Sequence, residues 1–91
     1  MIKYQTEFET YIKANGKGPA EKVAESVKTY VANLNSVSRH LGISINAKVL
    51  GTDSDIDDLS GRLSQLGKIS PKNIKFYRSA MQQYVNMVNG I

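Results

Sequence analysis

The side chains best suited to chemistry in this sequence are the cations and amides of its C-terminal third. Residues 59–91 contain no aspartate or glutamate, although the whole chain has 8 acidic and 12 basic residues. At about 100° per residue, a helix over 71–90 gathers its polar side chains within roughly a third of its circumference. The residues on this face are Lys72, Lys75, Arg78, Ser79, Gln82 and Asn86. Such a face is typical of nucleic-acid binding, because cations seek phosphates and amides can hydrogen-bond bases or sugars.

Two further cations, Arg62 and Lys68, precede this helix and extend its positive charge. The sequence therefore predicts a nucleic-acid-binding site made of Arg62, Lys68, Lys72, Lys75, Arg78, Gln82 and Asn86. No acidic residue on the same helix neutralises the cations of this face, so we expect them to be free for phosphates. The alternative interpretation is a solvated surface without a ligand.

No motif typical of an active site accompanies the basic face. The sequence lacks a G-x-x-x-x-G-K-[ST] phosphate loop, an H-E-x-x-H zinc helix and a G-x-S-x-G nucleophile turn. The run Asp53-x-Asp55-x-Asp57 resembles the start of a calcium loop. However, the sixth position is Asp58 where glycine is required, and the twelfth is Ser64 where glutamate is required. We therefore expect a helix N-terminus enriched in aspartate, with no metal site, no cofactor and no catalytic residue.

The single histidine and the tyrosines have structural interpretations. His40 follows Arg39 at the end of a predicted helix, where a cation meets the negative end of the helix dipole. The five tyrosines fall on apolar stripes, which predicts rings in the core and hydroxyl groups at its edge: Tyr4, Tyr11, Tyr30, Tyr77 and Tyr84. Phe76 departs from the main stripe beside Lys75. Because a base-stacking platform needs an aromatic ring beside lysines, the role of Phe76 stays open.

Apolar residues at steps of three and four predict the helices that position these side chains. The longest stripe lies between Pro19 and Gly42 and consists of Ala20, Val23, Val27, Tyr30, Leu34, Val37 and Leu41. A second stripe follows Ser70-Pro71, a helix-start signal, and consists of Ile74, Tyr77, Met81, Tyr84 and Val88. We expect these two helices to supply most of the core.

Two shorter helices and one loop complete the prediction. Residues 3–14 form a first helix that ends at an Asn15–Gly18 turn, and a third helix ends at Gly67. Asp53 or Ser54 is the expected N-cap of this third helix. Residues 43–52 alternate weakly, so we expect a packed loop with a helical turn near 47–50 instead of a lone strand. The fold class is therefore all-α, a compact bundle of four main helices with short loops.

Composition bounds the class of protein. A chain of 91 residues makes one small domain, and the absence of cysteine excludes disulfides and thiolate metal sites. No apolar run reaches the ~20 residues that span a bilayer, and the charged N-terminal residues do not resemble a signal peptide. We expect a cytoplasmic protein without a membrane partner.

Three stretches carry a resemblance to a known family. They are Glu7-Phe8-Glu9-Thr10-Tyr11-Ile12, Ser26-x-x-x-Tyr30-x-x-x-Leu34 and Ser79-Ala80-Met81-x-x-Tyr84-Val85. This layout resembles the helical N-terminal accessory domains of bacterial restriction endonucleases of the HNH or modification-dependent type. It is also similar, more weakly, to the SAM-like core-binding domain of tyrosine recombinases. The resemblance implies that residues 1–91 are a single helical domain, the N-terminal part of a longer protein with its nuclease elsewhere.

The predicted function is accordingly a non-catalytic, DNA-associating accessory domain that contacts phosphates through its basic C-terminal helix. Its predicted partners are DNA and either a second copy of the chain or the catalytic domain of the same polypeptide. The alternative is a protein-interaction or dimerisation module with no nucleic-acid role. In that case Val31, Phe76 and Met87 are the expected exposed residues of a dimer seam.

Overall fold

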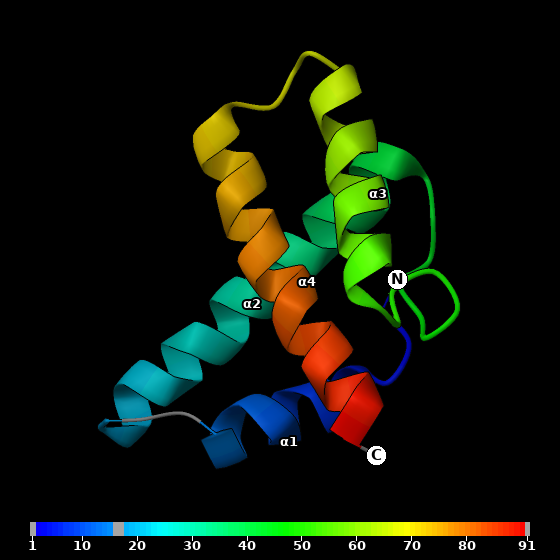
Figure 1. Ribbon diagram of the computed structural model, residues 1–91. Coiled ribbons are helices and arrows are strands. Elements are labelled where there is room, and N and C mark those ends of the chain that lie inside the picture. The colour runs from blue at the N-terminus through cyan, green and yellow to red at the C-terminus, as the bar shows by residue number, and fades with distance from the viewer. Residues whose placement is uncertain (1, 16–17, 91) are drawn as a thin grey trace.

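The computed structural model describes residues 2–15 and 18–90, and its helices confirm the predicted all-α fold (Figure 1). Four α-helices follow one another along the described chain: α1 (Gln5–Asn15), α2 (Ala20–Leu41), α3 (Asp53–Gln65) and α4 (Pro71–Gly90). The turn predicted at 15–18 includes residues 16 and 17, which lie outside the described part. None of the helices within 2–15 and 18–90 combines the length and apolar character needed to cross a membrane.

Helix α4 is the centre of the arrangement, since it contacts the other three helices. It crosses α2 at a steep angle, and α3 runs antiparallel beside it, joined by residues 66–70 (Figure 1). Helix α1 lies across the C-terminal end of α4 and also packs on α2. Because α2 and α4 cross, their N-terminal ends diverge on one side of the molecule.

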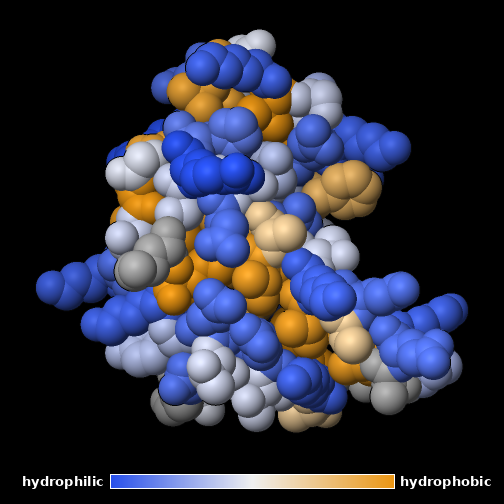
Figure 2. Space-filling model, turned by 180° about the vertical axis from the view of Figure 1, so that it is seen from behind, coloured by the Kyte–Doolittle hydropathy of each residue, from blue (hydrophilic) through white to orange (hydrophobic). Residues whose placement is uncertain are grey.

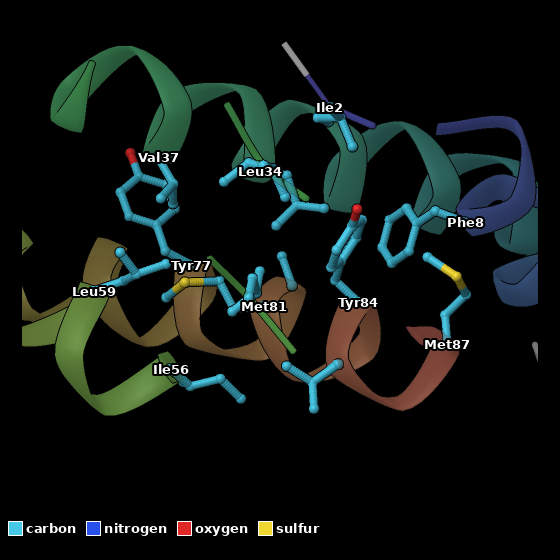
Figure 3. Close-up of a cluster of buried hydrophobic side chains, with 14 of the residues drawn as sticks. Ile2, Phe8, Leu34, Val37, Ile56, Leu59, Tyr77, Met81, Tyr84 and Met87 are labelled. Carbon is cyan, nitrogen blue, oxygen red and sulfur yellow. The ribbon is translucent and has the colours of Figure 1, made fainter. Parts of the chain in front are cut away.

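The core draws on every helix and on the loops. Among the described side chains, α4 buries Tyr77, Ala80, Met81, Tyr84, Val85 and Met87. Helix α2 buries three apolar residues, Val27, Leu34 and Val37, and α3 buries three as well, Ile56, Leu59 and Leu63. Figure 3 shows these side chains meeting between the helices, with Phe8 of α1 against Tyr84. As expected, α2 and α4 together supply nine of the seventeen buried hydrophobic side chains among the described residues, although α3 buries as many as α2 does.

The N-cap of α3 lies one residue before the first of the two predicted positions. Thr52 is the N-cap, and its side chain accepts a hydrogen bond from the Asp55 backbone N–H (3.2 Å). The Asp55 carboxylate in turn accepts from the backbone N–H groups of Gly51 (2.9 Å) and Thr52 (3.2 Å). This reciprocal capping box satisfies donors that the first helical turn leaves unpaired, so Thr52 is preferred over Asp53 or Ser54.

Two other predicted helix signals, at Ser70-Pro71 and at Gly42, are confirmed. The Asn73 backbone N–H donates to Ser70 Oγ (3.3 Å), so α4 begins at the predicted Ser70-Pro71 pair. Gly42 ends α2 in the left-handed conformation (φ 64°), and its N–H donates to the Ser38 carbonyl. A side chain with a Cβ adopts this backbone conformation only with strain.

The segment between α2 and α3 is the packed loop that the sequence predicts. The Leu50 N–H donates to the Asn46 carbonyl (2.9 Å), which closes the expected turn. The Asn46 side chain accepts from the N–H groups of Lys48 and Val49 (2.9 and 3.1 Å). Ile45 forms a single parallel bridge with Ile2, and both side chains are buried. The weak alternation of this loop thus reflects one bridge and its buried side chains.

The bridge at Ile2 also delays the first helix. The Lys3 N–H donates to the Ile45 carbonyl (2.7 Å), and Tyr4 adopts a left-handed conformation (φ 62°) before α1 begins at Gln5. Tyr4 is exposed, so its predicted place in the core is wrong. The Lys3 carbonyl accepts a hydrogen bond from the hydroxyl of Tyr84 (2.6 Å). Helix α4 therefore anchors the N-terminal segment directly.

Candidate nucleic-acid interface

Three lysines surround the start of α4. Lys72 and Lys75 are exposed on its first turns, and Lys68 is exposed in the connection from α3. Within residues 2–15 and 18–90, no ion pair or hydrogen bond involves these three ammonium groups. The first turn of α4 contains no acidic residue. We call Lys68, Lys72 and Lys75 the lysine cluster.

The C-terminal part of the predicted basic face is paired with α3. Arg78 Nη2 lies 2.9 Å from Asp57 Oδ1, and the side-chain amide of Gln82 donates to Asp53 Oδ1 (3.2 Å). Antiparallel packing of α3 on α4 places these aspartates, 21 and 29 residues earlier in the chain, beside the face. The expectation that Arg78 is free for phosphates is therefore wrong, because an acid from another helix neutralises it.

Two other predicted site residues are also engaged locally. Arg62 Nε lies 3.3 Å from Asp58 Oδ2, one helical turn earlier on α3. The carbonyl oxygen of the Asn86 side chain accepts from the Gln82 amide (3.1 Å). Both ion pairs are well exposed to solvent, and such pairs contribute about 0.2–1 kcal/mol. They reduce the charge available to a ligand without strongly fixing the side chains.

The aspartates of residues 53–57 and His40, which the sequence also offered for chemistry, make contacts within the fold. Asp55 caps α3, while Asp53 and Asp57 face α4. Within the described residues, no group of three or more histidine or acidic side chains is placed to hold a metal ion. The ring of His40 is exposed and lies 6.3 Å from that of Tyr77, centroid to centroid.

A groove opens beside the lysine cluster where α2 and α4 diverge. It has a volume of about 280 Å³ and is lined by Ser26, Thr29, Tyr30, Asn33, Phe76 and Ser79. Figure 2, seen from behind, shows the outline of the molecule indented between the N-terminal ends of these two helices. Phe76 is 49% exposed, and among the described residues it is one of three large exposed hydrophobic side chains. We call this hollow the α2–α4 groove; the sequence pointed to it only through the off-stripe position of Phe76.

The three residues of the predicted dimer seam lie in three different places. Phe76 lines the α2–α4 groove, whereas Val31 is half-buried in a hollow between α1 and α2. Met87 is buried and borders a third hollow, of about 430 Å³, between α1 and the end of α4. A seam made of these three residues is therefore wrong. We call the third space, with Tyr11, Ala14 and Met87 in its wall, the α1–α4 hollow.

Comparisons of this chain with protein-family models, with curated proteins and with solved structures find no match. The lysine cluster, the α2–α4 groove and the α1–α4 hollow are therefore the features from which a function can be argued.

Proposed function

We propose that this domain associates with DNA through phosphate contacts made by the lysine cluster. The observation that carries the proposal is three exposed lysines without an ion-pair partner among the described residues, gathered at one helix start. The N-terminal end of a helix is itself partly positive, since its first N–H groups lack intrahelical acceptors. An approaching phosphate thus meets the ammonium groups and the helix dipole together.

The expected affinity is modest and strongly dependent on salt. Each phosphate that a lysine neutralises contributes a slope of about −0.9 to a plot of log K against log salt concentration. Three contacts therefore predict a slope of about −3 and a non-specific Kd of roughly 10⁻⁴–10⁻⁶ M at physiological salt. Arg78 and Arg62 contribute less than the lysines, because each is already paired with an aspartate.

The proposal includes the accessory role that the resemblance to restriction-endonuclease N-terminal domains implies. The lysine cluster would add DNA affinity to a catalytic domain carried elsewhere on the polypeptide, in the cytoplasm. The chain would not be an enzyme on its own, since the sequence has no phosphate loop, zinc-protease helix or nucleophile turn. Non-specific phosphate contacts suit such a role, because they hold an enzyme near DNA without dictating sequence.

The test is a fluorescence-anisotropy titration of duplex DNA at several salt concentrations. The double variant Lys72→Ala/Lys75→Ala should bind more weakly and lower the magnitude of the salt slope by about 2. Lys48→Ala is the matched control. It removes an exposed lysine from the 46–50 turn. This turn lies near the C-terminal end of α4, away from the lysine cluster, because the Gly51 carbonyl that follows it accepts a hydrogen bond from Asn89. A double variant that binds like the parent would refute the proposal.

The alternative function, protein interaction, is favoured by a different observation, the α1–α4 hollow. Tyr11, Ala14 and Met87 give it an apolar wall, and polar side chains such as Thr6 and Glu7 lie at the same site. An apolar hollow with a polar surround is typical of a docking site. Light scattering, together with the DNA titration, distinguishes the two functions. A protein that is dimeric at micromolar concentration and does not bind DNA supports protein interaction, whereas a monomer that binds DNA supports association with DNA.

A further inference from the structure

The α2–α4 groove is built from two helical faces that each begin with a lysine. On α4, Lys72, Phe76 and Ser79 follow at steps of four and three, so they share one face. On α2 the same steps relate Lys22, Ser26, Thr29 and Asn33. The Ser26 hydroxyl donates to the Lys22 carbonyl (3.1 Å), which confirms that these two residues are stacked by one turn. A polar groove with an aromatic ring therefore lies between two helical faces, each of which has a lysine one turn before the lining residues.

Phe76 supplies an apolar surface that its own domain does not use fully. Half of the side chain is exposed, and no ring contact joins it to another aromatic residue in the described chain. On the other side of the groove, Tyr30 is half-buried and makes an edge contact with Phe8, with ring centroids 6.5 Å apart. Tyr30 is thus held by the core, whereas Phe76 can accept a flat ligand on its face.

The polar groups of the groove offer both donors and acceptors. The Asn33 amide and the hydroxyls of Thr29 and Ser79 have no hydrogen-bond partner among the described residues. Because the Ser26 hydroxyl already donates to Lys22, it remains an acceptor. An amide with nearby hydroxyls can hydrogen-bond the edge of an unpaired base. Four of the six lining residues are polar, so an occupant that carries hydrogen-bonding groups as well as a flat ring matches the groove.

Charge and size agree with this chemistry. Lys22, Lys72 and Lys75 lie on or beside the two groove faces, and Glu21 and Glu25 lie along the margin of the α2 face. The mouth of the groove is therefore net positive, and Lys72 belongs to both the groove face and the lysine cluster. The volume of about 280 Å³ is just below the ~300–1,000 Å³ typical of drug-sized ligands. One planar ring system, with its phosphate left outside, suits such a space.

We propose that the α2–α4 groove takes an unpaired base of single-stranded DNA, stacked on Phe76, while the flanking phosphates lie on Lys72 and Lys75. This inference rests on the proposed function, since it uses the same lysines, and it names the form of DNA that the domain prefers. Duplex DNA keeps its bases stacked inside the helix, so it can use the lysine cluster but cannot fill the groove. Single strands should accordingly bind more tightly than duplexes at equal phosphate number.

The experiment compares three probes by fluorescence anisotropy: an oligo-dT of about 10 nucleotides, an abasic oligonucleotide of equal length, and a duplex. Phe76→Ala should weaken oligo-dT binding about 5- to 150-fold, the equivalent of roughly 1–3 kcal/mol for one stacked base. The salt slope of oligo-dT binding should be the same for Phe76→Ala as for the parent, because no phosphate contact is lost. Binding of the abasic and duplex probes should be unaffected. Phe76→Tyr keeps an aromatic face and should restore oligo-dT binding to within about twofold.

Each outcome separates the two proposals. If oligo-dT and the abasic probe bind equally and Phe76→Ala changes neither, the groove does not take a base, whereas binding that depends on Lys72 and Lys75 would still support the proposed function. If Lys72→Ala/Lys75→Ala binds DNA as tightly as the parent does, the proposed function fails as well. Thermal unfolding by circular dichroism verifies that the Phe76 variants fold; a half-exposed residue is expected to tolerate the change.

Discussion

Replacing Tyr84 by phenylalanine tests how the N-terminal segment is attached to α4. Tyr84 is fully buried, its ring lies 5.7 Å from that of Phe8, and its hydroxyl donates to the Lys3 carbonyl (2.6 Å). The substitution Tyr84→Phe keeps the ring and removes the hydrogen bond. A bond of this kind contributes about 0.5–1.5 kcal/mol net. Lys3 is exposed, so water can partly replace the lost donor. We therefore expect a loss of about 1 kcal/mol at neutral pH.

The same hydroxyl makes stability depend on alkaline pH. Burial, followed by the charges of Tyr4 and Glu7, raises the pKa of Tyr84 from 10.0 to about 12. Between these two values the unfolded chain releases the Tyr84 proton while the folded chain keeps it. The contribution of this hydroxyl to the free energy of unfolding is therefore fully present below about pH 10. It is lost as the pH rises toward 12, and the loss reaches about 2–3 kcal/mol. Tyr84→Phe lacks this loss. The parent and the variant should be equally stable near about pH 11, and the variant should be the more stable above it.

Urea unfolding followed by far-ultraviolet circular dichroism measures both effects. The two proteins are compared at the same pH, at several values from neutral to about pH 11. Because they share all other ionisable side chains, the ionisation of those side chains cancels in the difference. Tyr4→Phe is the control at neutral pH, because Tyr4 is exposed and the loss of its hydroxyl should change stability there by less than about 0.5 kcal/mol. A difference between parent and Tyr84→Phe that stays constant with pH would refute the role assigned to the buried hydroxyl.

Three further substitutions test the core, a buried polar group and the interface. Leu34→Ala, at a fully buried site, should lower the free energy of unfolding by about 2–5 kcal/mol in urea titrations. Ser60→Ala should raise it by about 1 kcal/mol, because the Ser60 hydroxyl is buried without a hydrogen-bond partner among the described residues. Asp57→Asn releases Arg78, so the salt slope of duplex binding should steepen by about 0.9; an unchanged slope would show that Arg78 does not reach a phosphate.

The helices could be predicted from the sequence because their signals are local. The apolar stripe around Leu34 and the Ser70-Pro71 start each involve residues within a few turns, and the structure confirms both elements. The N-cap at Thr52 was missed because Asp53 and Ser54 are equally good cap residues. What decides among them is a reciprocal bond with Asp55, which depends on how the chain enters the helix.

The candidate interface could be predicted only in part, because its charge balance depends on packing between helices. The pairs Arg78–Asp57 and Gln82–Asp53 join residues that are far apart in sequence, and helical periodicity carries no information about them. The burial of Met87 has the same origin, since α1 covers the end of α4. Within the described residues, no ion pair joins Lys72 or Lys75 to an acidic side chain. Their unpaired state is the part of the prediction that packing left unchanged.

Helix α4 buries one face and exposes the other, and this separation makes the functional proposals testable. Tyr77, Met81 and Tyr84 face the core, so changes there alter folding before they could alter binding. Lys72, Lys75 and Phe76 face outward, and their removal should leave the core intact. A loss of DNA binding in these variants would therefore report on the surface itself. Arg78 is the exception, because it joins α4 to α3. The exposed ion pair it forms is worth about 1 kcal/mol or less, so even there binding and stability can be measured separately.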